Sequence, residues 1–320
     1  MKTLIAALTA CAALAAPEAL AQSYPSKPVK IVVPFGAGGG VDNLTRLIAK
    51  PLSERLAQPV VIDNRPGGNA NIGADVAAKS PPDGYTLLMT SSVSTVNRAM
   101  FRNLPYDALT DFVEIARIAQ APSIVVVAAD LPVKSVAELI AYGKANAGKV
   151  SYASTGVGSG QHLNGEIFTK YAGVEAVHVP YKAGPPALTD VMGGRVTFMI
   201  TNPSEVLPQI AGGKMRALAV TGNTRMKVLP DVPTLNEVGV KNKGTTGWWG
   251  LVAPAKTPKP IVERLAAETL AILKDPQVKA ALLAMGLEEA PMGSQEFTQF
   301  YKDEVKRYEG IIKEFNIQTE

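Results

Sequence analysis

The sequence predicts an α/β protein built as two lobes, each a mostly parallel sheet flanked by helices, with a ligand cleft between them. Short apolar runs rich in β-branched residues alternate with helical patterns along the chain, which is typical of parallel sheets covered on both faces. Two glycine-rich turns, about 120 residues apart, each join a predicted strand to a predicted helix. A chain of 320 residues is also long enough for about two domains.

The predicted strands are short apolar segments in which valine, isoleucine and threonine are common. They cover Val29–Val33, Val60–Asp63, Thr86–Thr90, Ile124–Ala128, Val150–Ala153, Ala176–Val179, Val196–Thr201, Arg216–Thr221 and Gly250–Ala253. Apolar residues spaced at a period of 3.6 predict the intervening helices. These cover Asn43–Leu56, Ile72–Lys79, Ser135–Ala145, Gln161–Tyr171, Ala187–Met192 and Ser204–Ile210.

Two packing helices are predicted near the C-terminus. Pro260 opens the first, and the second carries an apolar stripe that runs from Phe297 to Phe315. Pro51 lies inside the predicted helix Asn43–Leu56, and because proline removes a backbone donor we expect it to kink or shorten that helix.

Two stretches are expected to cross between the lobes. The segment Ile115–Ile124 contains Pro122 and joins two apolar runs, and Thr221–Gly247 is rich in proline and glycine with little periodicity. We therefore predict a first lobe from residues 22–121 plus 222–320 and a second lobe from residues 122–221. Each lobe then owns one glycine-rich turn, so the two turns face each other across the cleft, where small ligands preferentially bind.

The two turns are candidate anion-binding loops. The first contains Phe35, Gly36, Ala37, Gly38 and Gly39, and the second contains Ser154, Thr155, Gly156, Gly158 and Ser159 with His162 just beyond it. Glycine lets backbone N–H groups approach a ligand, and the helix N-terminus behind each turn adds about half a positive charge. Two such loops would hold a carboxylate without a catalytic side chain, which favours a receptor over an enzyme.

Other residues near the predicted cleft have defined expectations. Ser91 and Ser92 follow a strand and Tyr181 ends one, so we include them among the candidate ligand-binding residues. Asp42 stands where it would cap a helix or pair with Arg46 one turn later, and His178 is expected to be structural.

The N-terminus has the features of a secretory signal peptide over residues 1–21. A short basic segment precedes an apolar run, and Ala19-Leu20-Ala21 predicts cleavage after Ala21 and a periplasmic location. A lipoprotein acylated on Cys11 is the less favoured alternative, because the apolar segment ahead of that cysteine is very short.

Several function classes find no support in the sequence. The net charge is +4 with scattered basic residues, so we expect no nucleic-acid partner. Neither glycine-rich turn completes a dinucleotide fingerprint, and no phosphate-binding Gly-x-x-x-x-Gly-Lys-Ser/Thr motif or Gly-x-Ser-x-Gly elbow is present. The chain has two histidines and one cysteine, which leaves a transition-metal site unsupported, and no cofactor is expected.

The sequence resembles the Bug-type extracytoplasmic solute receptors, the binding components of tripartite tricarboxylate transporters. The resemblance covers essentially the whole chain after the signal segment and rests on short motifs whose order and spacing together are specific. They are Pro34-Phe35-Gly36-Ala37-Gly38-Gly39 with Asp42, Asn64-Arg65-Pro66-Gly67-Gly68, Asn71-Ile72-Gly73-Ala74, Ser80-Pro81-Pro82-Asp83-Gly84-Tyr85, Val179-Pro180-Tyr181-Lys182, Pro186-Ala187-Leu188-Thr189-Asp190 with Gly193-Gly194, and Pro233-Thr234 with Glu237 and Gly239.

The resemblance implies a two-lobed type II periplasmic binding fold that closes on a small organic carboxylate. It implies that the turn 35–39 and the turn 154–159 with His162 are the two ligand-holding loops, and that the partners are the membrane permease subunits of a tripartite tricarboxylate transporter. We expect a monomer. Two alternatives stay open: a secreted hydrolase of a small ester or amide, and the ligand-binding component of a sensor.

Overall fold

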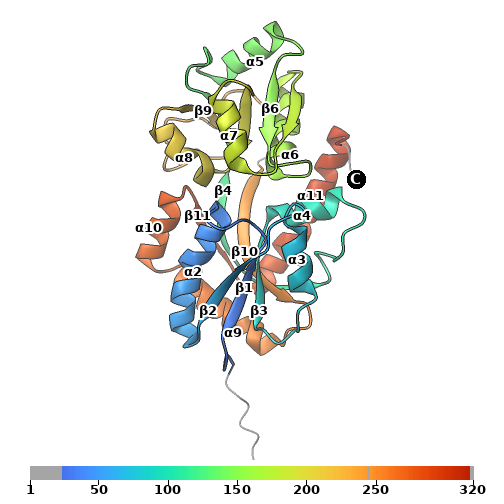
Figure 1. Ribbon diagram of the computed structural model, residues 1–320, viewed down its shortest axis with the longest axis vertical. Coiled ribbons are helices and arrows are strands. Elements are labelled where there is room, and N and C mark those ends of the chain that lie inside the picture. The colour runs from blue at the N-terminus through green and yellow to red at the C-terminus, as the bar shows by residue number, and fades with distance from the viewer. Residues whose placement is uncertain (1–23, 244, 318–320) are drawn as a thin grey trace, which may run out of the picture.

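The computed structural model describes residues 24–243 and 245–317, which form two lobes stacked along the long axis of the molecule (Figure 1). The predicted signal peptide, with Ala21 and Cys11, lies outside these ranges. Each lobe contains one sheet flanked by helices, so the predicted two-lobed α/β fold is confirmed. Within the described ranges no helix is long and apolar enough to cross a membrane.

The sheet of lobe 1 has six strands in the order β11-β4-β10-β3-β1-β2. The strands are β1 (Val29–Val33), β2 (Val60–Asn64), β3 (Thr86–Ser91), β4 (Phe112–Pro122), β10 (Thr246–Pro254) and β11 (Glu288–Met292). The helices of this lobe are α2 (Gly40–Leu56), α3 (Asn71–Ala78), α4 (Ser92–Met100), α9 (Lys259–Ile272), α10 (Pro276–Ala284) and α11 (Ser294–Phe315). One core packs α2, α9 and α10 on the sheet, and another packs α3 and α11 on it.

The sheet of lobe 2 has five strands in the order β7-β6-β8-β5-β9. The strands are β5 (Ile124–Ala128), β6 (Ser151–Ser154), β7 (Val177–Pro180), β8 (Phe198–Thr201) and β9 (Met215–Val220). The helices are α5 (Val136–Ala145), α6 (Gly160–Ala172), α7 (Gly184–Met192) and α8 (Pro203–Ala211).

Both sheets are mixed, which corrects the expectation that they are mostly parallel. In lobe 1, β1 pairs with β2 and β3 in parallel, whereas β10 runs antiparallel to β3 and β4. In lobe 2, β5 runs antiparallel to β8 and β9. The cause is the double passage of the chain between lobes: β4 leads into β5 through the single residue Ser123, and the chain returns along β10 in the opposite direction. Neighbouring strands that carry the chain out and back must be antiparallel.

The sequence patterns missed four elements. The expected crossover Ile115–Ile124 lies mostly within strand β4, and β11, α4 and α10 were not predicted. Helix α2 runs through Pro51 to Leu56, so this proline does not shorten it. The lobe boundaries 22–121 plus 222–320 and 122–221 stay a prediction, although β4 and β5 meet next to residue 122 and β9 ends at Val220.

The predicted C-terminal stripe is buried and also reaches lobe 2. Phe297 and Tyr301 pack in the lobe 1 core, whereas Tyr308 and Ile312 join a cluster with Leu163 of α6. Figure 1 shows the C-terminal end of α11 extending toward α6. The two lobes therefore share an apolar contact beside the strands that connect them.

Candidate functional site

A cavity of about 950 Å³ lies between the lobes. Lobe 1 contributes the loop 34–41, the loop 66–70 and the start of α4. Lobe 2 contributes residues 155–157, 159–161, 163–164, 181–185, 202 and 204–205. The crossing segment supplies Ser123, Trp249 and Thr245. A volume of this size accommodates a small organic molecule.

Six helices begin at this cavity. Its lining includes first-turn residues of α2 and α4 from lobe 1 and of α6, α7 and α8 from lobe 2, together with Ala70, the residue that caps the start of α3. The first N–H groups of a helix have no partner inside it, and the helix dipole places partial positive charge there. The cavity therefore combines the partial positive charge of these helix ends with few ionised side chains, which suits an anion.

The first glycine-rich loop is held by Asp42 from behind. Gly38 has a φ of +77°, which glycine adopts without strain, and its N–H donates to Oδ2 of Asp42 at 2.8 Å. Arg46 and Asn64 also donate to this carboxylate, at 2.8 and 3.0 Å. Burial raises the pKa of Asp42, but the hydrogen bonds from Arg46, Gly38 and Asn64 outweigh it and hold the pKa below its usual value. The expected pairing with Arg46 is present, and Asp42 shapes the loop without lining the cavity.

Most predicted site residues line the cavity. They are Phe35, Gly36, Ala37, Gly38, Gly39, Ser91, Ser92, Thr155, Gly156, Ser159 and Tyr181. Ser154, Gly158 and His162 do not. Gly158 is covered by lobe 1, since a Cβ at this position would lie 2.9 Å from the ring of Phe101.

His162 lies behind the second loop. Its Nδ1 accepts from the N–H of Gly158 at 3.3 Å, and its ring stacks on that of His178 with 4.2 Å between centroids. His178 in turn stacks on Tyr152 at 5.0 Å. Burial lowers the pKa of both histidines, to about 4 for His178, where His162 adds to the effect. Two neutral imidazoles therefore pack behind the second loop and support it, which agrees with the structural role expected for His178.

Ser154 and His178 form the kind of hydrogen bond that a hydrolase would use, but the pair lies outside the lining of the cavity. Ser154 Oγ lies 2.6 Å from Nε2 of His178, and it also bonds both the N–H and the carbonyl of Gly156. The side chain of Ser154 is fully buried and does not line the cavity. In this conformation the pair fixes the loop conformation and does not meet a bound ligand.

A chain of hydrogen bonds crosses the lobe 2 wall of the cavity. Thr155 Oγ1 donates to Oε1 of Gln161 at 2.9 Å, and Nε2 of Gln161 donates to Oγ1 of Thr201 at 3.5 Å. Thr201 Oγ1 donates to Oε2 of Glu205 in a short bond. Tyr181 is similarly engaged: its hydroxyl donates to Asp190 at 2.6 Å, and burial and this carboxylate raise its pKa to about 12. Its aromatic face is what remains for a ligand.

Sequence reasoning missed the loop 67–70 as a cavity wall. Gly67, Gly68, Asn69 and Ala70 all have positive φ, which is strained for the last two. The buried Asn97 holds this loop through bonds to the carbonyl oxygen and the side chain of Asn69 at 2.7 Å. The Asn64–Gly68 motif and Asn71 were noted in the sequence only as family motifs, and the strain was not visible there.

The two crossings between the lobes, at Ser123 and after Thr221, form a hinge that is polar and reaches the cavity. Ser123 and Thr221 bond across the two crossings, through Thr221 N–H to Ser123 O at 2.9 Å and Ser123 N–H to Thr221 Oγ1 at 3.0 Å. Asn164 donates to Ser123 Oγ at 3.1 Å and accepts from Thr245 Oγ1 at 2.5 Å. Because Ser123, Asn164 and Thr245 also line the cavity, a ligand there touches the hinge directly.

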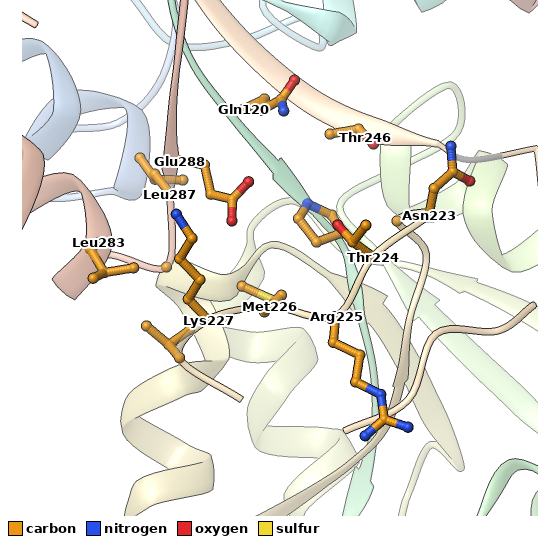
Figure 2. A pocket seen from close by; sticks show the side chains of 14 residues that line it. Gln120, Asn223, Thr224, Arg225, Met226, Lys227, Thr246, Leu283, Leu287 and Glu288 are labelled. Carbon is orange, nitrogen blue, oxygen red and sulfur yellow. The ribbon is translucent and has the colours of Figure 1, made fainter. Parts of the chain in front are cut away.

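A second cavity of about 260 Å³ lies on another side of the crossing strands, and it shares Thr246 and Leu287 with the first. Figure 2 shows the side chains of Lys227 and Glu288 projecting into it, and Met226 also lines it. Within the described ranges, no group of three or more His, Cys, Asp or Glu side chains is arranged to hold a metal ion.

Comparison with known proteins places these features in context. Residues 44–317 match the family model described as "Tripartite tricarboxylate transporter family receptor". The protein BugT of Bordetella pertussis is 35% identical over 307 residues, covering 95% of this chain and 94% of its own. The periplasmic binding protein BugD superposes with a TM-score of 0.86 at 32% identity, over 93% of this chain and all of its own. A structure of an R. palustris protein with adipate gives a TM-score of 0.88 at 38% identity, over 92% and 99% of the two chains.

Proposed function

Because the chain belongs to the tripartite tricarboxylate transporter receptor family, we propose that it captures a small organic carboxylate between its lobes and delivers it to the permease subunits of such a transporter. The family is one of periplasmic solute-binding receptors, which gives the protein its place and its class. The observation that carries the carboxylate assignment is the convergence of six helix N-termini on one cavity.

The chemistry of the cavity supports an anionic ligand held mainly by the backbone. The cavity is lined by Gly36, Ala37 and Gly39 of the first loop and by Gly156 and Ser159 of the second. We propose these residues, with the other cavity-lining predicted residues, as the ligand contacts, and we assign Ser154, Gly158 and His162 to supporting the second loop. The R. palustris relative was solved with adipate, itself a carboxylate.

Capture proceeds by lobe closure. A ligand that bonds loops of both lobes binds the closed state more tightly than the open one, and this difference in affinity shifts the population toward closure. The hinge bonds between Ser123 and Thr221 lie beside the cavity, so rotation about the two crossings brings the loops together while both sheets stay intact. The permease then recognises the closed form. The protein acts as a monomer after cleavage following Ala21, with no chemical step.

The alternative of a hydrolase needs a nucleophile that reaches a ligand. Ser154 and His178 are hydrogen-bonded, but the buried position of Ser154 supports a structural role. A sensor component would use the same cavity and differ in its membrane partner, so co-purification with a permease subunit distinguishes it from a transport receptor.

The test is a thermal-shift screen of ligand-stripped mature protein against small carboxylates, each paired with its neutral primary amide. A ligand at 100 times its Kd stabilises the folded state by about 2.7 kcal/mol, which raises Tm by about 4 °C at an unfolding entropy of about 2.1 cal/mol/K per residue. We expect at least one acid, and no amide, to produce such a shift. Stabilisation by amides and acids alike, or by no acid in protein that unfolds cooperatively, would overturn the proposal.

A further inference from the structure

One acidic side chain lies in the wall of this anion-binding cavity. Glu205 is the third residue of α8 and lines the cavity from lobe 2. A Cβ added to Gly184, the first residue of α7, would lie 3.4 Å from the carboxylate of Glu205, so this carboxylate packs against the N-terminus of α7. The carboxyl group of Glu205 therefore lies at two of the helix ends that attract anions.

The hydrogen bonds around Glu205 run in one direction. Thr155 donates to Gln161, Gln161 to Thr201, and Thr201 to Glu205. Thr201 is fully buried, so its single hydroxyl proton is committed to the carboxylate. An ionised carboxylate has only acceptor sites, so the lone pairs that Thr201 and Gln161 leave open can accept from a donor on the ligand. The lobe 2 wall at Glu205 therefore favours a ligand that carries a hydrogen-bond donor.

The charged side chains that line the cavity also favour a ligand with a donor at Glu205. Among the residues that line the cavity, the side chains with a formal charge are Glu205 and the exposed Lys182 at its edge. Glu205 lines the same cavity as the loops 35–39 and 154–159, so a ligand whose carboxylate these loops hold has Glu205 in the wall around the rest of it. A second ionised carboxylate there would face a like charge in a partly desolvated site, which costs several-fold to many-fold in affinity.

We propose that Glu205 is a specificity-determining residue that selects carboxylates carrying a hydroxyl or amino donor at their other end and rejects dicarboxylates. This inference rests on the proposed function and names the ligand class within it. It sets this protein apart from its relative solved with adipate, whose two ends are both carboxylates.

Acid pH should relax this selection. Burial raises the pKa of Glu205, although hydrogen bonds from Thr201 and Gln161 oppose the shift, and a protonated Glu205 becomes a donor that accepts a second carboxylate. Of the other ionisable groups on the surrounding elements, Asp190, His162 and Asp42 are engaged by neighbouring side chains. On α7, Asp190 is bound by Arg195 and Tyr181; on α6, His162 stacks on His178. On α2, Asp42 is bound by Arg46, and Lys182 stays exposed at the edge.

The test is calorimetric titration with matched pairs of acids at neutral pH: adipate against ω-hydroxyhexanoate, succinate against γ-hydroxybutyrate, and terephthalate against para-hydroxybenzoate. The variants are Glu205→Gln, which keeps the acceptor for Thr201 and adds a donor, and Glu175→Gln, an exposed lobe 2 control with the same loss of charge. In the wild type and in Glu175→Gln we expect the hydroxy acid of a bound pair to bind more tightly. In Glu205→Gln the preference should shift toward the diacid by about tenfold or more.

The results separate the inference from the proposed function. An unchanged ratio of affinities in Glu205→Gln, or a wild type that prefers the diacid, overturns the role of Glu205 while leaving the receptor function in place. Failure of the wild type to bind any of these acids, and any acid of the thermal-shift panel, overturns the function itself. Repeating the titration at lower pH should shift the ratio of diacid to hydroxy-acid affinity toward the diacid more in the wild type than in Glu205→Gln. The variant serves as the control, because in it the ratio changes only through protonation of the ligand.

Discussion

The contact between Gly40 and Ser204 offers a way to block closure without touching either sheet. Gly40 is the first residue of α2 in lobe 1, and Ser204 lies in the first turn of α8 in lobe 2. A Cβ built on Gly40 would lie 2.4 Å from Oγ and 3.3 Å from Cβ of Ser204. The helix ends of the two lobes therefore meet at this point, and a methyl group on Gly40 would clash with Ser204.

The change Gly40→Ala should weaken ligand binding while leaving the lobes folded. Alanine is a better helix former than glycine, so α2 itself gains up to about 1 kcal/mol in the open state. In the closed state the methyl group requires Ser204 to rotate and its Cβ to move by a few tenths of an ångström. Overpacking of this kind costs about 1–3 kcal/mol, which corresponds to affinity lower by about 5-fold to 150-fold.

The assay is titration of the best ligand from the thermal-shift screen into wild type, Gly40→Ala, Ser204→Gly and the double variant. Ser204→Gly removes the atoms that clash, so the double variant should regain most of the affinity lost in Gly40→Ala. The melting temperature of ligand-free Gly40→Ala serves as the control for folding. Equal affinity in Gly40→Ala and wild type would refute the contact as a feature of the closed state, and so would failure of Ser204→Gly to rescue.

Three further predictions concern the loops and the hinge. Replacing Asp42, which is 1% exposed, with Asn should lower the free energy of unfolding by about 1–3 kcal/mol in urea titrations, because three donors lose their charged acceptor. The pKa of His178 is lowered from 6.5 to about 4 by burial and by His162, so the stability contributed by its neutral form is complete above pH 6.5 and is lost as the pH falls toward 4. A His178→Gln variant should therefore show a smaller fall in Tm across that interval, and an equal fall would count against this role. Trp249 lines the cavity and Trp248 does not, so ligand should change the tryptophan emission of wild type and Trp248→Phe, whereas Trp249→Phe should respond little.

The sequence predicted what depends on local patterns. Strand β1, the turn behind it and α2 follow from a valine run, consecutive glycines and periodic apolar residues, and each of these acts within a few residues. The segment Ile115–Ile124 was interpreted only as a crossover containing Pro122, and the structure shows that strand β4 runs up to this proline as its last residue. Helix α4 begins with hydroxyl residues, which are weak helix formers, and it is stabilised by packing against α11 from the far end of the chain.

The candidate site divides in the same way. Glycine turns are visible in sequence because few residues adopt positive φ, but the side chains that complete the walls come from separate elements. Glu205 looks in sequence like an ordinary acidic residue in the first turn of a helix. Its place in the cavity depends on how β8 and α7 pack, which no local pattern reports. His162 was expected to line the cleft, but its stacking on His178 is set by the neighbouring parallel strands β6 and β7.

The arrangement of helix ends explains why one charge can govern both closure and selectivity. Closing the lobes brings N-termini from both sides to one cavity, and these partial positive charges repel one another unless an anion lies between them. Glu205 supplies part of that negative charge from within lobe 2, and a ligand carboxylate supplies the rest. A ligand with no ionised end would leave the helix ends facing each other, whereas a second ionised end at the Glu205 wall would meet a like charge. The helix ends therefore make closure depend on an anionic ligand, and Glu205 acts locally against a second ionised end.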